Sequence, residues 1–158
     1  MTTNFSIKPT QNGIKIFFLS NQNSCRSQMA EAVLKSFDKF QELEIYSAGI
    51  APVNHVSPVA IEVMAEIGID LKQGAPEHYS KFSDLEFDYL ITVGDGTADQ
   101  LKLPPVKFKR KMHLGFHNPY KSFRDREELK EKCREIRDEI KIEMDYFYHR
   151  ILKKKAAF

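Results

Sequence analysis

The residues from Ile14 to Glu31 restrict the possible folds more than any other part of the chain. An apolar run, IKIFFL, ends at Ser20 and is followed by polar loop residues that end in Arg26-Ser27, where a helical pattern begins. The short apolar run predicts a buried strand, and Ser27 is a favourable helix N-cap. In such a strand–loop–helix unit, backbone N–H groups and the positive end of the helix dipole point into the loop, and an arginine can grip two oxygens. The stretch therefore predicts a cradle for phosphate or a similar oxyanion.

Strand-like and helix-like patterns alternate along the rest of the chain. Four strands are predicted: two apolar runs at residues 14–19 and 89–93, a short segment at residues 44–47, and a loosely alternating segment at residues 106–113. The Ser57-Pro58 pair predicts the start of a helix that ends at Gly68. A long amphipathic helix is predicted from about residue 123, with a buried stripe of residues at spacings of three and four: Leu129, Cys133, Ile136, Ile140, Met144, Phe147 and Ile151. This alternation predicts a three-layer α/β fold with a parallel sheet of about four strands and a ligand site beyond their carboxyl ends.

Length, charge and cysteine content narrow the class of protein. The 158 residues suit one domain, which we expect at residues 14–158 after a flexible leader at residues 1–13. A formal net charge of +2 gives no reason to expect nucleic acid as a partner, and no apolar run approaches the roughly 20 residues that cross a membrane. Two cysteines and a polar N-terminus predict a reducing, cytoplasmic location. The histidines lack metal-ligand spacing, so we expect neither zinc nor another cofactor.

The sequence IFFLSNQNSCRSQMAE, at residues 16–31, resembles the signature of the low-molecular-weight protein tyrosine phosphatase superfamily. It is most similar to the thioredoxin-coupled arsenate reductases of that superfamily, in which a strand ends in a cysteine that is followed by five residues and Arg-Ser. The resemblance continues through YSAG at residues 46–49, the helix at residues 58–70 and RDEIK at residues 137–141, and covers about residues 14–150. It implies a four-stranded parallel sheet in the flavodoxin-like order 2-1-3-4.

The resemblance also implies roles for individual residues. Arg26 stands where the family grips the oxyanion, and Cys25 stands where the arsenate reductases carry a second loop cysteine. The anion would be surrounded by the whole loop, which consists of Ser20, Asn21, Gln22, Asn23, Ser24, Cys25, Arg26 and Ser27. Some of these reductases bind potassium, at positions that correspond to Asn23, Glu31, Ser47 and Glu77.

The chain departs from the family pattern at each group that makes bonds or moves protons. Ser20 stands in place of the nucleophilic cysteine, and Asn118 stands in place of the aspartate that serves as general acid. Gly94 and Leu101 fall near the positions of the two cysteines that pass a disulfide to thioredoxin. Gln22 stands in place of a small glycine, and a positive φ at this position would be costly for a residue with a side chain.

These departures predict impaired catalysis. A helix N-terminus and an arginine lower the pKa of a loop cysteine to about 3.5–7.5, whereas a serine hydroxyl needs an adjacent base. An asparagine cannot supply the leaving group with a proton, a contribution typically worth about 10²–10⁴-fold. We therefore predict a protein that binds an inorganic oxyanion or a phosphorylated ligand with little turnover. Thioredoxin is not expected as a partner, because the thiols that would act in sequence are missing.

Three other interpretations remain open. In the first, the protein is an active tyrosine phosphatase or arsenate reductase, and Ser20 is an engineered replacement for cysteine. In the second, His117 or another histidine activates Ser20, or Cys25 acts as a redox thiol; the sequence does not decide whether Cys25 faces the loop or the core, where it would be inert. In the third, the loop is vestigial and the protein binds a partner through another surface.

Overall fold

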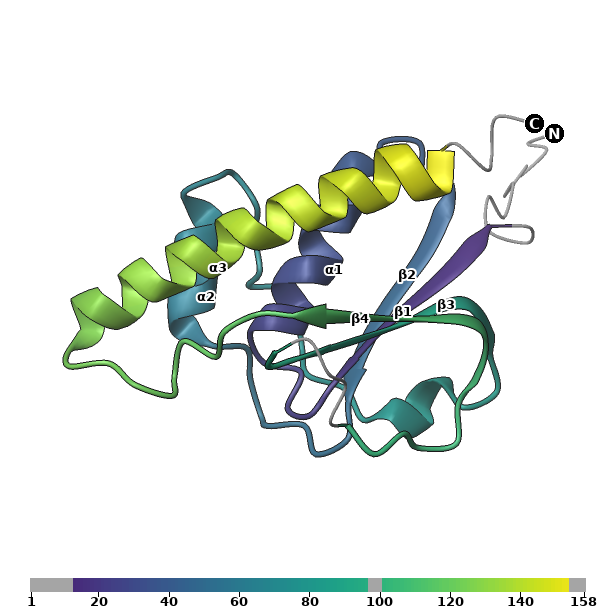
Figure 1. Cartoon of the computed structure of the whole chain (residues 1–158), viewed down its shortest axis with the longest axis horizontal. Coiled ribbons are helices and arrows are strands. Elements are labelled where there is room, and N and C mark those ends of the chain that lie inside the picture. Colours follow the sequence, from purple (N-terminus) through teal and green to yellow (C-terminus); the bar gives the residue numbers. More distant parts are fainter. Residues whose placement is uncertain (1–12, 97–100, 154–158) are drawn as a thin grey trace, which may run out of the picture.

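The computed structural model of the chain describes residues 13–96 and 101–153. Its sheet consists of β1 (Ile14–Ser20), β2 (Leu43–Gly49), β3 (Glu86–Gly94) and β4 (Lys107–Gly115). The strands are parallel and follow the order β2-β1-β3-β4 (Figure 1). This is the order that the family resemblance predicted.

Helices cover the sheet mainly on one face. They are α1 (Arg26–Phe37), α2 (Pro58–Ala65) and α3 (Arg126–Tyr146), and α3 continues directly into the π-helical segment η2 (Phe147–Leu152). The opposite face is covered by the 3₁₀ turn η1 (Tyr79–Phe82) and its flanking loops (Figure 1). The predicted three-layer α/β fold with a long C-terminal helix is therefore confirmed. Within the described ranges, no helix is long and apolar enough to cross a membrane.

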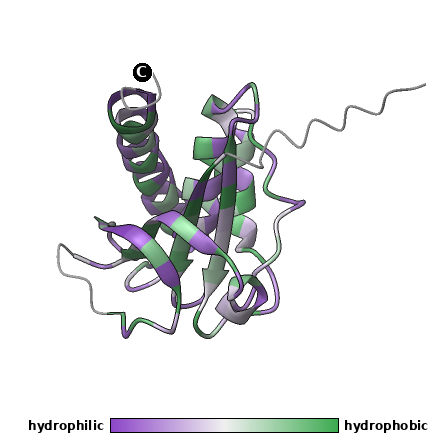
Figure 2. Cartoon of the chain, turned by 90° about the vertical axis from the view of Figure 1, so that its right-hand side faces the viewer, coloured by the Kyte–Doolittle hydropathy of each residue, from purple (hydrophilic) through white to green (hydrophobic). Residues whose placement is uncertain are grey.

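The central strand β1 explains why its sequence is apolar almost without interruption. Ile16 and Phe18 pack into the large core under the helices, while Phe17 and Leu19 pack into a smaller core on the opposite face. All four side chains are fully buried. Because both faces of this strand are covered, it shows no alternation of apolar and polar residues. Figure 2 shows that apolar residues gather in the centre of the sheet, whereas hydrophilic residues face outward on α3.

The predicted apolar stripe of the C-terminal helix is confirmed over most of its length. Six of its seven members are buried: Leu129, Cys133, Ile136, Ile140, Met144 and Phe147. The helix begins at Arg126 rather than near residue 123, because the side chain of Asp125 caps it by accepting from the N–H of Glu128 at 2.9 Å. The π-helical segment adds residues to each turn and so shifts the buried face, and Leu152 is buried where the periodicity predicted Ile151.

Several predicted boundaries differ from those observed. β2 and β4 extend to Gly49 and Gly115, two residues beyond the predicted strand ends, because both continue to pair with their neighbours. Ser57 caps α2 as predicted, but the helix ends at Ala65, before the turn that contains Gly68. The predicted leader, apart from its last residue, lies outside the described residues.

Candidate functional site

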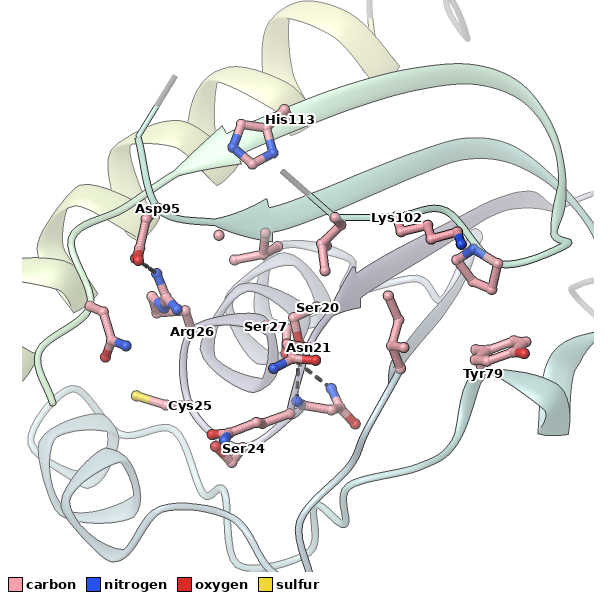
Figure 3. A pocket seen from close by; sticks show the side chains of 18 of the residues that line it. Ser20, Asn21, Ser24, Cys25, Arg26, Ser27, Tyr79, Asp95, Lys102 and His113 are labelled. Atoms are coloured by element: carbon pink, nitrogen blue, oxygen red, sulfur yellow. Dashed lines mark hydrogen bonds and ion pairs between the residues drawn. The ribbon is translucent and has the colours of Figure 1, made fainter. Parts of the chain in front are cut away.

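The loop of residues 21–25 joins β1 to α1 at the carboxyl edge of the sheet, where the sequence predicted a ligand site. It forms part of the wall of a pocket of about 860 Å³. In Figure 3, Asp95 lies on one side of the loop, and Tyr79 and Lys102 lie on the other. All eight residues of the predicted anion-binding set, from Ser20 to Ser27, line this pocket.

The backbone carbonyls of residues 20–25 all accept hydrogen bonds from neighbouring parts of the fold. Four of the donors are N–H groups of the segment 50–57, at 2.8–3.3 Å. The other two are the side-chain amide of Gln28 and the N–H of Met29. Among the described residues, no acceptor binds four backbone N–H groups of the loop, those of Gln22, Ser24, Cys25 and Arg26. Because the loop carbonyls are hydrogen-bonded to the fold, the loop N–H groups can donate to a bound anion. This arrangement is an anion-binding nest.

Strand β2 approaches the loop closely at Gly49. A Cβ atom at this position would lie 2.7 Å from the carbonyl oxygen of Asn21 and 3.2 Å from the backbone nitrogen of Asn23. The absence of a side chain thus allows the segment that follows Gly49 to reach the loop carbonyls. The glycine is required here by a close backbone approach.

We expect Gly49→Ala to lower the free energy of unfolding by about 1–3 kcal/mol, because the added methyl group overlaps the loop backbone. Urea denaturation measures this change. Gly94→Ala is the matched control, since a Cβ there would meet the His113 ring at an ordinary 3.6 Å, and a change within about 0.5 kcal/mol is expected. Equal losses in the two variants would contradict the close approach at Gly49.

The hydroxyl of Ser20, which the resemblance placed at the nucleophile position, is held inside the loop. Its Oγ lies 2.8 Å from Oγ of Ser27 and accepts the N–H of Asn23 at 3.0 Å. Ser27 was predicted to cap α1, and this prediction was wrong. The helix begins at Arg26 with Cys25 at the cap position and no side-chain cap, because the Ser27 hydroxyl binds Ser20 and Asn23 instead. Neither described partner of the Ser20 hydroxyl is a general base.

Asn23 gives the loop its shape. It is only 1% exposed and adopts a φ of 53°, which asparagine tolerates better than most residues. Its side-chain amide forms four hydrogen bonds of 3.0–3.1 Å, with the side chains of Ser27, Ser47 and Gln28 and the backbone of Glu77. Gln22 does not adopt the positive φ that would be costly there. The left-handed residue of the loop is Asn23, and these hydrogen bonds hold it in that conformation.

The four potassium candidates form a chain of contacts rather than a ring of oxygens around one point. Asn23 donates to Ser47 at 3.1 Å, and Ser47 donates to a Glu31 carboxylate oxygen at 2.6 Å. The Glu77 carboxylate pairs with Lys81 at 2.8 Å, so Glu77 contacts Asn23 only through its backbone. Of the described residues, no group of three or more His, Cys, Asp or Glu could hold a metal ion. A potassium role for these residues stays a prediction.

Arg26, the predicted oxyanion grip, lines the pocket but is engaged on one side. Its Nη1 donates to a carboxylate oxygen of Asp95 and to the backbone carbonyl of Phe116, both at 2.7 Å (Figure 3 shows the Asp95 contact). The Arg26 side chain is 19% exposed, and the Asp95 side chain is 48% exposed. A carboxylate at the rim therefore competes with any bound anion for the positive charge of Arg26.

We expect Asp95→Asn to tighten phosphate binding by about two- to fivefold, because ion pairs near the surface are worth up to about 1 kcal/mol. The neutral amide keeps an oxygen acceptor for Arg26 while the negative charge disappears. Calorimetric titration of phosphate into the native and variant proteins measures the change. Weaker binding in the variant would mean that Asp95 orients Arg26 rather than competing with the anion.

Asn118, which the resemblance placed at the general acid position, lies at the pocket and stabilises a turn. Its side-chain oxygen accepts the N–H of Tyr120 at 3.0 Å. His117 is exposed and is not among the residues that line the pocket. The histidine at the pocket is His113 on β4, whose Nδ1 lies 2.9 Å from Oγ1 of Thr92.

The structure resolves the orientation of Cys25. Its sulfur is directed away from Ser20 (Figure 3), and the residue packs into the large hydrophobic core with 7% of its surface exposed. Gly94 and Leu101 stand at the two positions where the resemblance implied reductase cysteines. Both residues line the pocket.

Two pocket residues, Asp95 and His113, were missed by the sequence reasoning. Both lie at the carboxyl edge of the sheet, at the ends of β3 and β4. The rule that ligands bind at this edge, applied to every polar residue there, would have found them.

The comparisons with known proteins agree with this geometry. The family model described as "Low molecular weight phosphotyrosine protein phosphatase" matches residues 15–157. The "Arsenate reductase" of Shouchella clausii is 36% identical over 127 residues, which cover 79% of this chain and 88% of that protein. The "Arsenate reductase 1" of Staphylococcus epidermidis is 36% identical over 139 residues, which cover 86% and 96%. A solved structure described as "An arsenate reductase in the phosphate binding state" has a TM-score of 0.72 and 26% identity, and covers 87% of this chain and 98% of that one.

A strand–loop–helix nest at the edge of a four-stranded parallel sheet defines the class of protein. With a match over nearly its whole length, the chain belongs to the low molecular weight phosphotyrosine protein phosphatase family. The two curated relatives described above carry the name arsenate reductase.

Proposed function

We propose that the protein binds a tetrahedral oxyanion, such as phosphate or arsenate, or a phosphorylated ligand in the loop of residues 20–27, and that its catalysis is impaired. The observation that carries the proposal is the orientation of the loop backbone, with its carbonyls bonded to the fold and four N–H groups without an acceptor among the described residues. These donors lie at the N-terminus of the twelve-residue helix α1, whose dipole favours an anion. The related structure described as a phosphate binding state supports the same ligand class.

The surroundings of Ser20 support the proposed impairment. The Ser27 hydroxyl and the Asn23 N–H, its described hydrogen-bond partners, cannot take up its proton as a base would. Asn118 lies at the pocket but has no acidic proton to give a leaving group. The groups that hold an anion are therefore present, whereas those that would break a bond to it are altered.

The size of the pocket favours a ligand that is larger than an inorganic oxyanion. Its volume of about 860 Å³ lies within the range of about 300–1,000 Å³ that is typical of pockets for small organic molecules. Apolar side chains, among them Ile50, Leu101 and Leu103, line it beside the polar loop. A phosphorylated ligand could place its phosphoryl group in the loop and its organic part against these side chains.

The names of the curated relatives favour arsenate reduction as a second candidate. That reaction needs thiols that react in sequence, and the cysteines of this chain are Cys25 and Cys133, both buried. Ser20, Gly94 and Leu101 stand at the positions where the resemblance implied reactive cysteines. We propose on this ground that arsenate is bound without being reduced and that thioredoxin is not a partner. A cytoplasmic location stays a prediction.

Calorimetric titration of phosphate and arsenate at constant ionic strength, with chloride as the control anion, tests the proposal. We expect one saturable site, for which arsenate and phosphate compete because both are tetrahedral oxyanions of similar size. Absence of saturable binding through the millimolar range would overturn the proposal and favour a partner-binding protein with a vestigial loop. Thioredoxin-coupled turnover of arsenate by this protein would overturn the proposed impairment.

A further inference from the structure

The outward-facing side of α3 is mostly hydrophilic (Figure 2), but two of its exposed side chains are large and apolar. Ile142 is 70% exposed and Tyr146 is 59% exposed, and neither packs against the two hydrophobic cores of the sheet. Because they are four positions apart on a helix, they lie next to each other on one face. The helix runs along the outside of the molecule (Figure 1), so this apolar pair is accessible to a partner.

Charged side chains of opposite sign flank the apolar pair along the helix. Glu135 and Glu139 precede it on α3, and Arg150 follows it in η2, at spacings of three and four residues that continue the same face. All three are exposed, and within residues 13–96 and 101–153 no ion pair or hydrogen bond engages their side chains. We call Glu135, Glu139, Ile142, Tyr146 and Arg150 the outer stripe. It is acidic at one end, apolar in the middle and basic at the other end.

The outer stripe is complementary to a reversed copy of itself. When two copies of α3 pack antiparallel about a two-fold axis midway between Ile142 and Tyr146, each Ile142 contacts Tyr146 of the second copy. Glu139 and Arg150 lie about 8 Å to either side of that axis, at about 1.5 Å per residue. Each Glu139 therefore faces Arg150 of the second copy. We propose that the outer stripe binds a second copy of this chain in the antiparallel orientation.

The distribution of charge excludes the parallel orientation of the same two helices. A parallel pair would place Glu139 against Glu139 and Arg150 against Arg150, and like charges across an interface repel. The other exposed carboxylates near the apolar pair contribute less, because Asp138 is paired with Arg137 and Asp145 is paired with His149. The unpaired charges of the outer stripe thus favour one orientation.

A contact that uses one helix from each copy is small compared with the about 1,600 Å² of a standard stable interface, so we expect a weak dimer. Tyrosine is among the residue types enriched in protein interfaces, and Tyr146 lies near the centre of this one. None of the residues of the outer stripe lines the pocket. The inference therefore does not rest on the proposed function.

Sedimentation equilibrium of the native protein, from about 10 µM to about 1 mM as a weak interface requires, measures the association. We expect the average mass to rise from the 18.3 kDa of one chain toward twice that value. Ile142→Glu should weaken the association by about tenfold or more, because it places a carboxylate without a partner at the centre of the contact. Gln73→Glu is the matched control, since it adds the same charge at an exposed position outside the outer stripe and should leave the association unchanged.

Charge reversal tests the antiparallel orientation. Glu139→Arg and Arg150→Glu should each weaken self-association by about tenfold, because each variant creates like-charged pairs at both ends of the contact. An equimolar mixture of the two variants should associate as strongly as the native protein, since every pair in the mixed dimer again joins opposite charges. Lys72→Glu, which reverses an exposed charge in the loop after α2, is the control for net charge and should associate normally.

Three results would overturn the proposal. The first is a native protein that stays monomeric through the millimolar range. The second is an association that Ile142→Glu leaves unchanged, which would place the interface on another surface. The third is a mixture of Glu139→Arg and Arg150→Glu that associates no more strongly than either variant alone. Phosphate titration is not part of this test, so the proposed function stands or fails separately.

Discussion

The double variant Ser20→Cys, Asn118→Asp is expected to hydrolyse an aryl phosphate that the native protein leaves almost unchanged. The structure provides the surroundings that a cysteine nucleophile needs at position 20. The Asn23 N–H and the Ser27 hydroxyl lie at 3.0 and 2.8 Å from the present Oγ and would stabilise a thiolate. An aspartate at position 118 could keep the turn, because the side-chain oxygen that accepts the Tyr120 N–H is retained.

We expect the single variant Ser20→Cys to show weak turnover and the added Asn118→Asp to increase it by about 10²–10⁴-fold, the usual contribution of a general acid. Steady-state release of the phenol, measured across pH, determines both values. Ser24→Cys combined with Asn118→Asp is the control, since it places a thiol elsewhere in the same loop. If the double variant folds and binds phosphate but stays inactive, groups other than these two must also be altered for the proposed impairment to hold.

Arg26→Ala is expected to weaken phosphate binding by about 10- to 100-fold, because hydrogen bonds to charged groups contribute about 1.5–3 kcal/mol. The loss has two sources. The guanidinium no longer binds the anion, and Asp95 loses the partner that neutralises it at the pocket rim. Calorimetry and competition with arsenate measure the affinity.

Arg124→Ala is the matched control for Arg26→Ala. It removes the same formal charge from a side chain that is 90% exposed and pairs with Glu128 on α3. We expect phosphate binding to change by less than about twofold in this variant, because an exposed charge that is paired with a carboxylate contributes little. Similar weakening in both variants would show that net charge, and not the Arg26 guanidinium, determines the affinity.

Most of the fold was predictable because its sequence signals are local. The apolar run before Ser20, the Ser57-Pro58 start of α2 and the buried stripe of α3 depend on strand or helix periodicity and on capping chemistry within a few residues. Helix starts were less accurate where a side chain served another purpose. Ser27 is a good capping residue by type, yet its hydroxyl binds Ser20 and Asn23.

The site was predictable to the extent that it lies in one continuous segment. Residues 20–27 were identified from their order in the chain, and all of them line the pocket. Asp95 was not identified, because its contact with Arg26 joins residues that are 69 positions apart. Local periodicity in the sequence cannot predict such a long-range contact. The orientation of the Cys25 side chain is also long-range, because it depends on how α3 packs against α1.

The sequence by itself determined that this protein has a strand–loop–helix unit of the low molecular weight phosphatase type. It also led to the prediction that Ser20 and Asn118 stand at the nucleophile and acid positions. Only the tertiary structure decided how that loop is oriented. Its carbonyls are bonded to the segment after Gly49, and Asn23 takes the left-handed conformation. The physical reason is that residue types and spacings are properties of the chain, whereas the direction of a backbone N–H group is fixed by hydrogen bonds and packing between distant segments.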